Sequence, residues 1–310
     1  EVVLLAAFVY LVQEHTKVKS LLNGLKKLLE INENELKYLD GHLDFADHGA
    51  GFLNFNHQNA YDLDLFGKKS LYQRLNRTTT IEGSRQLAND IINQDDSNII
   101  ERQDWLKELS LQAEWRQEFQ SVGLLESENS GYKDLKDWFK QENWFQGKTA
   151  LKLLANISPL VFLALFLAFL FNFIPKEIPT TFFFLQLAIT GTQLKKINFL
   201  HGQLSKKQSS LNAYEGLLKT LAKANFKHET LNEIKKKAEG GADAIARFKN
   251  MLNLFDSRLN MIMGVVLNGA FLWDIRFSIK VEEWKNANNQ QLEVWINAIA
   301  KMESINSMAN

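Results

Sequence analysis

The chain has 310 residues, enough for about two domains of ~100–200 residues each, and it contains no cysteine. Disulfide scaffolds and thiol-based catalytic or metal sites are therefore excluded. Lysine plus arginine and aspartate plus glutamate both total 36, so no net charge favours a nucleic acid or an anionic surface as partner. Only three prolines and 16 glycines interrupt long stretches with helical spacing, and we predict a mainly α fold.

The first apolar run extends from Val2 to Val12. We expect residues 1–12 to be the end of a truncated N-terminal transmembrane segment, and residues 13–61 to be a connecting helix and loop. The loop, DGHLDFADHGAGF, gathers side chains of the types that zinc or manganese accepts. They are Asp40, His42, Asp44, Asp47 and His48. Their spacing matches no known ligand frame, so a solvated turn is the preferred interpretation and we assign no metal site.

Residues 71–90, LYQRLNRTTTIEGSRQLAND, place three threonines between two segments with helical spacing. Thr79 or Thr80 can accept a hydrogen bond from the free backbone N–H groups that begin the second helix, with Glu82 completing a capping box after Thr79. Gly83, in the first turn, indicates the close approach of another backbone. The threonines therefore predict a joint between helices and no chemical site.

The next segment, DDSNIIERQDWLKELSLQAEWRQEF, spans residues 95–119 and is predicted to form one amphipathic helix. Asp95, Asp96 and Ser97 are its candidate capping residues.

Two long apolar segments follow with a short polar turn between them. Residues 160–171, LVFLALFLAFLF, are wholly apolar, and with their flanks (residues 157–174) they make a run of 18, close to the ~17–25 that span a bilayer. Residues 178–194 include threonines and two glutamines but can also span as a helix. We predict a transmembrane hairpin over residues 155–194. The alternative is a hairpin buried in the core of a soluble protein, which twelve consecutive apolar residues disfavour.

Lysines gather at the outer ends of this hairpin. Lys148, Lys152, Lys195 and Lys196 flank it, whereas its tip carries only Lys176. Because positive charge concentrates on the cytoplasmic side of membrane proteins, we expect the rest of the chain to face the cytoplasm.

After the hairpin the sequence predicts long amphipathic helices. One should run from residue 192 to about residue 222, with a seven-residue apolar repeat that fails only at Lys207. The repeat consists of Ile197, Leu200, Leu204, Leu211, Tyr214, Leu218 and Leu221. Downstream helices, separated by a turn at Gly240 and Gly241, are its expected partners. They carry Ile245, Phe248, Leu252, Phe255 and Leu259, then Phe277, Val281 and Trp284, and finally Leu292, Trp295, Ile299, Met302 and Ile305. Residues 261–273, MIMGVVLNGAFLW, are too short to span a membrane, and we expect them in the core.

Residues 62–109, which begin DLDLFGKKSLYQRLNRTTTIEGSRQL, resemble the opening of the core domain in the MutS family of DNA mismatch repair ATPases. With His57 and Ala60 before it, the DLDLFG sequence most resembles the membrane-anchored MutS-related proteins of bacteria. The last 40 residues resemble the lever helices that lead into the family's ATPase domain. The signature residues that carry over are Asp62, Asp64, Gly67, Leu71, Leu75, Asn76, Thr78, Thr80, Gly83, Arg85, Leu87 and Arg102, with Glu303 in the tail.

The resemblance implies a MutS-like core over residues 62–154 and lever helices over residues 195–310, with the hairpin inserted where repair proteins carry a DNA-clamping insertion. In the family the signature residues build the core and set the joint between core and lever, and they are not catalytic. For the intact protein it also implies a C-terminal ATPase domain that this chain lacks, ATP and magnesium as cofactors, a homodimer, and a location at the bacterial inner membrane with the body in the cytoplasm.

The chain departs from the family in two elements that carry chemistry. It has no phosphate-binding loop GxxxxGK[ST], since the GKT at residues 147–149 lacks the leading glycine. It also has no Phe-x-Glu wedge of the kind that is pushed between base steps. We therefore expect no enzymatic activity and no cofactor in this chain, and any nucleic-acid binding to be weak and insensitive to mismatches.

Basic side chains offer no clear nucleic-acid surface. Lys235, Lys236 and Lys237 form a run, and Arg74, Arg77 and Arg85 lie near the threonines. They could contact phosphates, but solvated helix faces are the preferred interpretation.

The function predicted from the sequence is that of a core and lever module that relays nucleotide-driven motion in a membrane-anchored MutS-related ATPase. Its expected partners are its own ATPase domain, a second copy of the chain and membrane lipid. The alternative is a helical membrane scaffold or adaptor without nucleotide or DNA function. A phosphate-binding loop soon after residue 310 in the intact protein would separate the two.

Overall fold

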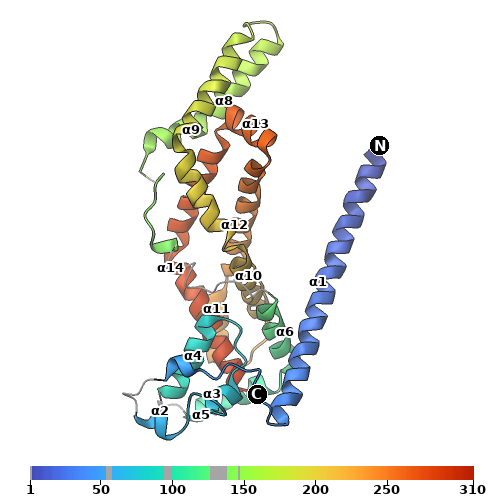
Figure 1. Ribbon diagram of the computed structural model, residues 1–310, viewed down its shortest axis with the longest axis vertical. Helices are drawn as coiled ribbons and strands as arrows, with labels where there is room; N and C mark the ends of the chain where they lie inside the picture. The colour runs from blue at the N-terminus through green and yellow to red at the C-terminus, as the bar shows by residue number, and fades with distance from the viewer. Residues whose placement is uncertain (1, 54–57, 94–98, 126–137, 146) are drawn as a thin grey trace. The chain divides into compact units, whose positions relative to one another are not determined.

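A computed structural model describes residues 2–53, 58–93, 99–125, 138–145 and 147–310 of the chain (Figure 1). These residues are mainly helical and contain no strand, which confirms the predicted class. They divide into two compact units. Unit 1 comprises Glu1–Tyr132, Asn212–Ala242 and Glu293–Asn310, and unit 2 comprises Lys133–Leu211 and Asp243–Leu292.

Unit 1 contains the first helices of the chain and the last turns of its final helix. Its elements are α1 (Val2–Leu39), the 3-10 helix η1 (Ala50–Phe52), α2 (Gln58–Asp62), α3 (Leu71–Leu75), α4 (Ile81–Ile92), α5 (Ile99–Ser110), α6 (Ala113–Leu124), most of α10 (Gln208–Lys223), α11 (Glu229–Ala238) and the end of α14 (Trp273–Met308). A small apolar core formed by Ala60, Leu65, Phe66, Tyr72, Leu87 and Ala88 holds α2, α3 and α4 together. Three residues with positive φ, Asp64, Gly67 and Lys69, turn the chain between α2 and α3.

The amphipathic helix predicted over residues 95–119 is two helices, because α5 ends at Ser110 and α6 begins at Ala113. On one straight helix of ~3.6 residues per turn, the side chains of Leu109 and Trp115 would point about 120° apart. The break lets Leu109 be buried while Trp115 packs on Phe226, with their ring centroids 5.1 Å apart. The predicted capping residues Asp95, Asp96 and Ser97 lie outside the described residues.

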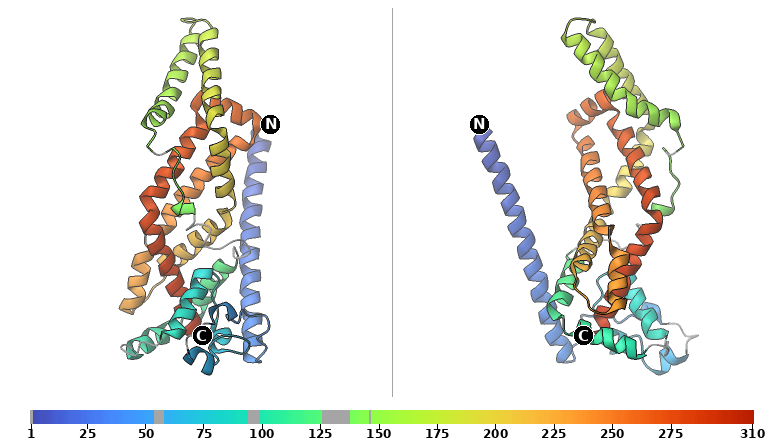
Figure 2. Two further views of the ribbon diagram at one scale, coloured as in Figure 1. Left: turned by 60° about the vertical axis from the view of Figure 1, so that its left-hand side comes forward. Right: turned by 180° about the vertical axis from the view of Figure 1, so that it is seen from behind.

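Unit 2 contains the apolar hairpin and the helices that pack against it. Its elements are α8 (Thr149–Leu170), α9 (Glu177–Ser205), the first residues of α10, most of α12 (Gly241–Phe255), the 3-10 helix η3 (Asp256–Leu259), α13 (Met261–Phe271) and α14 as far as Leu292. Stacked rings pack its interior: Phe248 lies 4.0 Å from Trp284 and 5.8 Å from Trp138, between ring centroids. Both views of Figure 2 show α13 joining the ends of α12 and α14, with the hairpin projecting past it.

The long helix predicted from residue 192 to residue 222 is interrupted. α9 ends at Ser205 and α10 begins at Gln208, so the break falls at Lys207, the one charged position in the repeat. All seven apolar residues of the repeat are buried, as predicted. The predicted turn before α12 is also confirmed, since Gly240 has a φ of 76°.

Two predictions about apolar residues in unit 2 are wrong. Leu259 is 67% exposed, because α12 ends at Phe255 and the following 3-10 helix changes the direction of the chain. Residues 261–273 do not form core as a whole. Met261 and Ile262 are 83% and 77% exposed, and α13 buries only its face with Gly264, Asn268, Gly269 and Ala270.

Within the described residues, one helix is long and apolar enough to cross a membrane, and that helix is α8. It ends at Leu170, earlier than the predicted residue 174. α13 and α14 reach the same length and composition only when taken together, and they are bent by 80° where they meet.

Candidate functional site

The last turns of α14 in unit 1 are surrounded by polar contacts from α1, α4, α6 and the segment before α4, and we call this region the α14 joint. At its centre, Glu303 is 3% exposed. One carboxylate oxygen, Oε1, accepts hydrogen bonds from Thr79 N at 2.8 Å, Thr79 Oγ1 at 2.5 Å and Thr80 N at 3.2 Å. The other oxygen accepts from the Thr80 hydroxyl. The two threonines therefore satisfy the carboxylate with two amides and two hydroxyls.

Thr80, one of these two threonines, also caps the start of α4. Thr80 is its N-cap, and its Oγ1 accepts from Gly83 N at 3.0 Å, as one of the two predicted caps. The predicted capping box is wrong, because Glu82 bonds Arg85 instead. A capping-box glutamate accepts from the backbone N–H of the cap. Here Glu303 does so, from 223 residues away.

The contact between Thr80 and Glu303 requires a glycine at position 83. A Cβ built at Gly83 would overlap the carboxylate of Glu303. The close approach predicted at Gly83 is therefore made by a side chain and not by another backbone.

Burial without a cation changes the acidity of Glu303. In the part of the chain that the structure describes, no lysine, arginine or histidine pairs with it. Desolvation disfavours the charged carboxylate and raises the pKa of Glu303 above its ordinary value of 4.5, although the hydrogen bonds from Thr79 and Thr80 act in the opposite direction.

The segment before Thr79 is fixed by its own polar contacts. Asn76 Oδ1 accepts from Thr78 N at 3.0 Å and from Thr78 Oγ1 at 2.6 Å. Ser84 Oγ lies 2.7 Å from the Thr78 hydroxyl. Arg77 N donates to Ser307 Oγ of α14 at 3.1 Å. Each residue between Asn76 and Thr80 is thus held, either to its neighbours or to α14.

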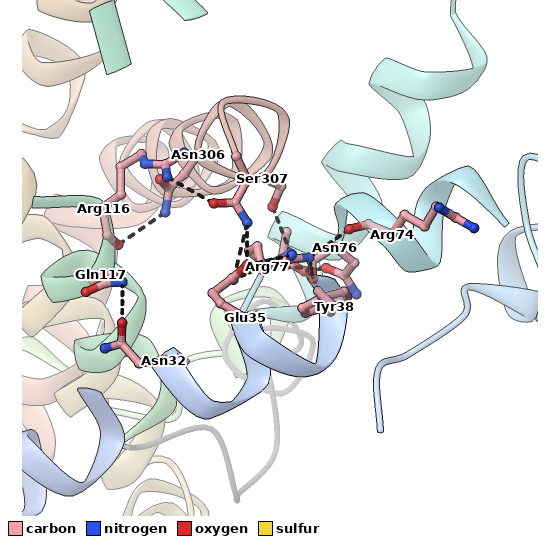
Figure 3. A network of polar contacts seen from close by, with 12 residues as sticks. Asn32, Glu35, Tyr38, Arg74, Asn76, Arg77, Arg116, Gln117, Asn306 and Ser307 are labelled. Carbon is pink, nitrogen blue, oxygen red and sulfur yellow. Dashed lines mark hydrogen bonds and ion pairs between the residues drawn. The ribbon is translucent and has the colours of Figure 1, made fainter. Parts of the chain in front are cut away.

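The Arg77 side chain is buried and lies beside Glu35 and Tyr38 of α1 (Figure 3). Its Nε and Nη2 donate to the two oxygens of Glu35 at 2.5 and 3.0 Å. Its guanidinium carbon lies 3.3 Å from the centre of the Tyr38 ring, and its Nη1 donates to the Arg74 carbonyl at 2.8 Å. The interpretation of Arg77 as part of a solvated helix face is therefore wrong, because α1 supplies both a carboxylate and an aromatic ring.

A second arginine contacts the end of α14. Arg116 of α6 donates from Nη2 to Asn310 Oδ1 at 2.9 Å, and its backbone carbonyl accepts from Asn306 at 3.3 Å (Figure 3). Among the described residues, its Nε and Nη1 have no hydrogen-bond partner. Burial lowers the pKa of Arg116, with the nearby charge of Glu35 acting in the opposite direction.

The joint is closed on its other side by an ion pair. Asp90 of α4 accepts from Lys301 Nζ at 3.0 Å on both oxygens and from Ser304 Oγ at 2.7 Å. Sequence reasoning missed Glu35, Asp90 and Arg116, since none of them stands in a recognisable local pattern.

The structure brings together four of the twelve signature residues at the joint: Asn76, Thr78, Thr80 and Gly83. Leu87 lies in the unit 1 core, and Asp64 and Gly67 lie in the turn before α3. The others are elsewhere on unit 1: Asp62, Leu71 and Arg85 are exposed, and Leu75 and Arg102 are half-buried. His57, from the narrower resemblance, lies outside the described residues.

The ligand-rich loop after α1 is organised by backbone contacts. Asp47 accepts from Gly49 N at 3.0 Å, and Gln73 Nε2 donates to the carbonyls of Leu43 and Ala46 at 2.9 and 3.0 Å. In the described part of the chain, no three histidine, aspartate or glutamate side chains are grouped so that they could hold a metal ion.

The α8–α9 hairpin of unit 2 is the second candidate region. The Phe162 and Phe183 rings pack between the two helices at 6.2 Å, and Ser158 Oγ donates to Gln186 Oε1 at 3.1 Å. Near the tip, phenylalanines of both helices line an open apolar groove of about 430 Å³. Most apolar side chains of α8 point outward, because only 11% of its most apolar stretch is buried.

The two regions differ in what they can do. The α14 joint contains a buried carboxylate and two arginines, but its groups bond one another and resemble no nucleophile, base and oxyanion set. The hairpin offers an apolar surface. Comparison of the chain with protein-family models, with curated proteins and with solved structures found no match in any of the three.

Proposed function

We propose that the chain is the core and lever module of a membrane-anchored MutS-related ATPase and relays nucleotide-driven motion. One observation carries the proposal. The resemblance places Thr80 and Glu303 at the joint between core and lever, although they are 223 residues apart, and these two side chains bond each other directly. A contact between the signature motif and the lever tail supports a shared architecture.

The lever would be α14. Its 36 residues form one uninterrupted helix, about 54 Å long at ~1.5 Å per residue, and it contributes to both units. Fixed at its end by Glu303, Ser307 and Asp90, this helix would move as one body when an attached ATPase domain changes state. That domain would bind ATP and magnesium, and a second copy of the chain would complete the assembly.

The decisive observation is the sequence that follows Asn310 in the intact protein. We expect a strand followed by GxxxxGK[ST], and a helical scaffold would lack it. Residues 1–310 alone should neither bind nor hydrolyse ATP.

Binding of matched and mismatched DNA duplexes tests the same proposal. Titration of the purified chain at two salt concentrations should give weak binding that falls steeply with salt and ignores the mismatch, as phosphate contacts alone would. A mismatch preference that survives high salt would mean that the chain reads DNA, and the mechanical role would be wrong.

The proposal also places the α8–α9 hairpin in the bacterial inner membrane, with the rest of the chain in the cytoplasm. The outward-facing apolar side chains of α8 support this, because a core helix of a soluble protein would be covered. Reporters fused at Lys176 and at Lys195 should appear on opposite sides of the membrane. Reporters on the same side would contradict the topology.

A further inference from the structure

α13 is apolar on its outer side as well as on its packed side. Five of its exposed side chains are Met261, Ile262, Met263, Val265 and Val266, and none of its 11 residues is charged. A helix that faces water normally carries polar residues on its outer side. A continuous exposed apolar face therefore indicates an apolar partner.

The packed side of α13 lies against the middle of the hairpin. A Cβ built at Gly269 would overlap the Phe183 ring, so the α13 backbone lies directly on α9. Phe271 packs on Phe162 of α8, with ring centroids 6.4 Å apart. α8 exposes apolar side chains on both sides of Phe162, from Leu153 to Leu170. The outer face of α13 is thus continuous with the middle of the apolar surface of the hairpin.

The segments that flank α13 are joined by an ion pair. Arg258, before the helix, donates from Nε to Asp274 Oδ2, after the helix, at 2.9 Å. Their side chains are 10% and 3% exposed, so the pair is buried and neutral as a unit. α13 is about 16 Å long at ~1.5 Å per residue. This is about half of the ~30 Å hydrocarbon thickness, so α13 can enter a bilayer and return but cannot cross it.

The single polar side chain of α13 is satisfied within the element. Asn268 Nδ2 donates to the Gly264 carbonyl at 2.9 Å, and its Oδ1 accepts from Asp274 N at 2.9 Å. Leu272, with a φ of 47°, makes the sharp turn into α14. A polar group bonded in this way needs no water, which is the condition for backbone and amide groups in lipid.

We infer that α13 is a re-entrant helix that lies in the lipid bilayer beside the α8–α9 hairpin, with Arg258 and Asp274 at its entry and exit. The inference rests on the proposed membrane insertion of the hairpin and adds a third lipid-facing helix to it. Lipid is favoured over a protein partner because the exposed face continues the apolar surface of α8 and carries no tryptophan, tyrosine or arginine, the residues in which the hot spots of protein interfaces are enriched.

The chain has no cysteine, so single labels can be introduced without background. We suggest Ile262→Cys and Val266→Cys on α13, Leu163→Cys as the hairpin reference, and Gln290→Cys on an exposed turn of α14 as the water reference. Each variant is labelled with a nitroxide and reconstituted in vesicles of phosphatidylcholine and phosphatidylglycerol at 3:1. Collision with oxygen reports lipid, and collision with a water-soluble nickel chelate reports water.

We expect Ile262 and Val266 labels to resemble Leu163, with oxygen accessibility several-fold above nickel accessibility, and Gln290 to show the reverse. If the α13 labels resemble Gln290 while Leu163 remains in lipid, the inference is wrong and the hairpin stands. If Leu163 also collides with nickel, the proposed membrane insertion fails as well. Low accessibility to both reagents, with spin–spin broadening that dilution by unlabelled chain removes, would mean that a second copy covers α13 and would also overturn the inference.

Discussion

The end of α14 and the α8–α9 hairpin use different contacts to hold their helices. At the α14 joint, Glu303, Ser304 and Ser307 are buried, and each is bonded to another part of the chain or to its own helix. In the hairpin, rings such as Phe162 and Phe183 meet between the helices, and Ser158 of α8 donates a hydrogen bond to Gln186 of α9. Hydrogen bonds are directional and costly to leave unmade, whereas apolar contacts depend mainly on area.

The two regions should differ in their sensitivity to substitution. The joint should tolerate little change in polarity or volume, because a buried donor or acceptor that loses its partner costs ~1–3 kcal/mol. The hairpin should tolerate apolar replacements well. Substitutions in the two regions, compared by the free energy of unfolding in one detergent or lipid, test this difference.

The largest effect is expected for Glu303→Ala. It leaves two amides and two hydroxyls of Thr79 and Thr80 without an acceptor, and buried unsatisfied groups cost ~1–3 kcal/mol each, so a loss of at least about 3 kcal/mol is expected. Urea unfolding followed by circular dichroism measures it. Glu303→Gln is the control, since its amide oxygen still accepts. Equal stability of the two variants would mean that the hydrogen bonds contribute little.

Glu35→Gln should follow. It removes the carboxylate from Arg77, whose side chain is 8% exposed. We expect a loss of about 2 kcal/mol, below the ~3–5 of a fully buried pair because Glu35 is partly exposed. Glu14→Gln breaks the exposed Glu14–Lys17 pair and should cost under ~1 kcal/mol. Similar losses for Glu35→Gln and Glu14→Gln would mean that the burial of Arg77 does not strengthen its ion pair.

Gly83→Ala should destabilise by ~1–3 kcal/mol, because the new Cβ overlaps Glu303 and forces the joint apart. Helix propensity alone predicts the opposite sign. Gly202→Ala in α9 is the matched control, since nothing lies within 4 Å of its added Cβ. It should stabilise by up to ~1 kcal/mol. A stabilising Gly83→Ala would show that the joint can rearrange cheaply.

The raised pKa of Glu303 predicts a pH dependence at the joint. The folded protein binds this proton more tightly than the unfolded chain, so the contribution is complete below the ordinary pKa and is lost as the pH rises through the raised value. Wild type should therefore lose stability relative to Glu303→Gln as the pH rises above the ordinary glutamate pKa of 4.5. The difference between the two unfolding curves isolates this group. A difference that grows in the opposite direction would mean that the hydrogen bonds outweigh burial.

The smallest effect is expected in the hairpin. Gln186 is buried and, among the described residues, its amide nitrogen has no hydrogen-bond partner. Gln186→Leu removes that group and should change the stability by less than ~1 kcal/mol. Thermal unfolding in detergent checks it, with Ser158→Ala as control. A loss of several kcal/mol would place a joint-like polar contact inside the hairpin.

Local patterns predicted the parts of this chain that local contacts decide. The apolar repeat on α9 and α10 identified buried residues such as Ile197 and Leu218, and the threonines correctly marked the start of α4. The one charged position in the repeat, Lys207, marks the break between α9 and α10. A single charged residue can equally be an exception within one continuous helix, so the repeat alone does not predict the break.

The joint could not be assembled from the sequence, because its partners are distant in the chain. Glu303 lies between the apolar positions Met302 and Ile305 and carries no sign that its partners are Thr79 and Thr80. The prediction that α13 lies in the core was wrong for a different reason. α13 has the composition of a buried helix, and periodicity cannot distinguish burial inside the protein from contact with an apolar environment outside it.

The distant cap on α4 has a consequence for the order of folding. Until Glu303 arrives, the amides of Thr79 and Thr80 at the start of α4 lack the acceptor that they have in the finished structure. During synthesis at ~5–20 residues per second, the ribosome needs roughly 10 to 45 s to make the 223 residues between Thr80 and Glu303. The start of α4 can therefore gain its full set of hydrogen bonds only after the last turns of α14 have been synthesised.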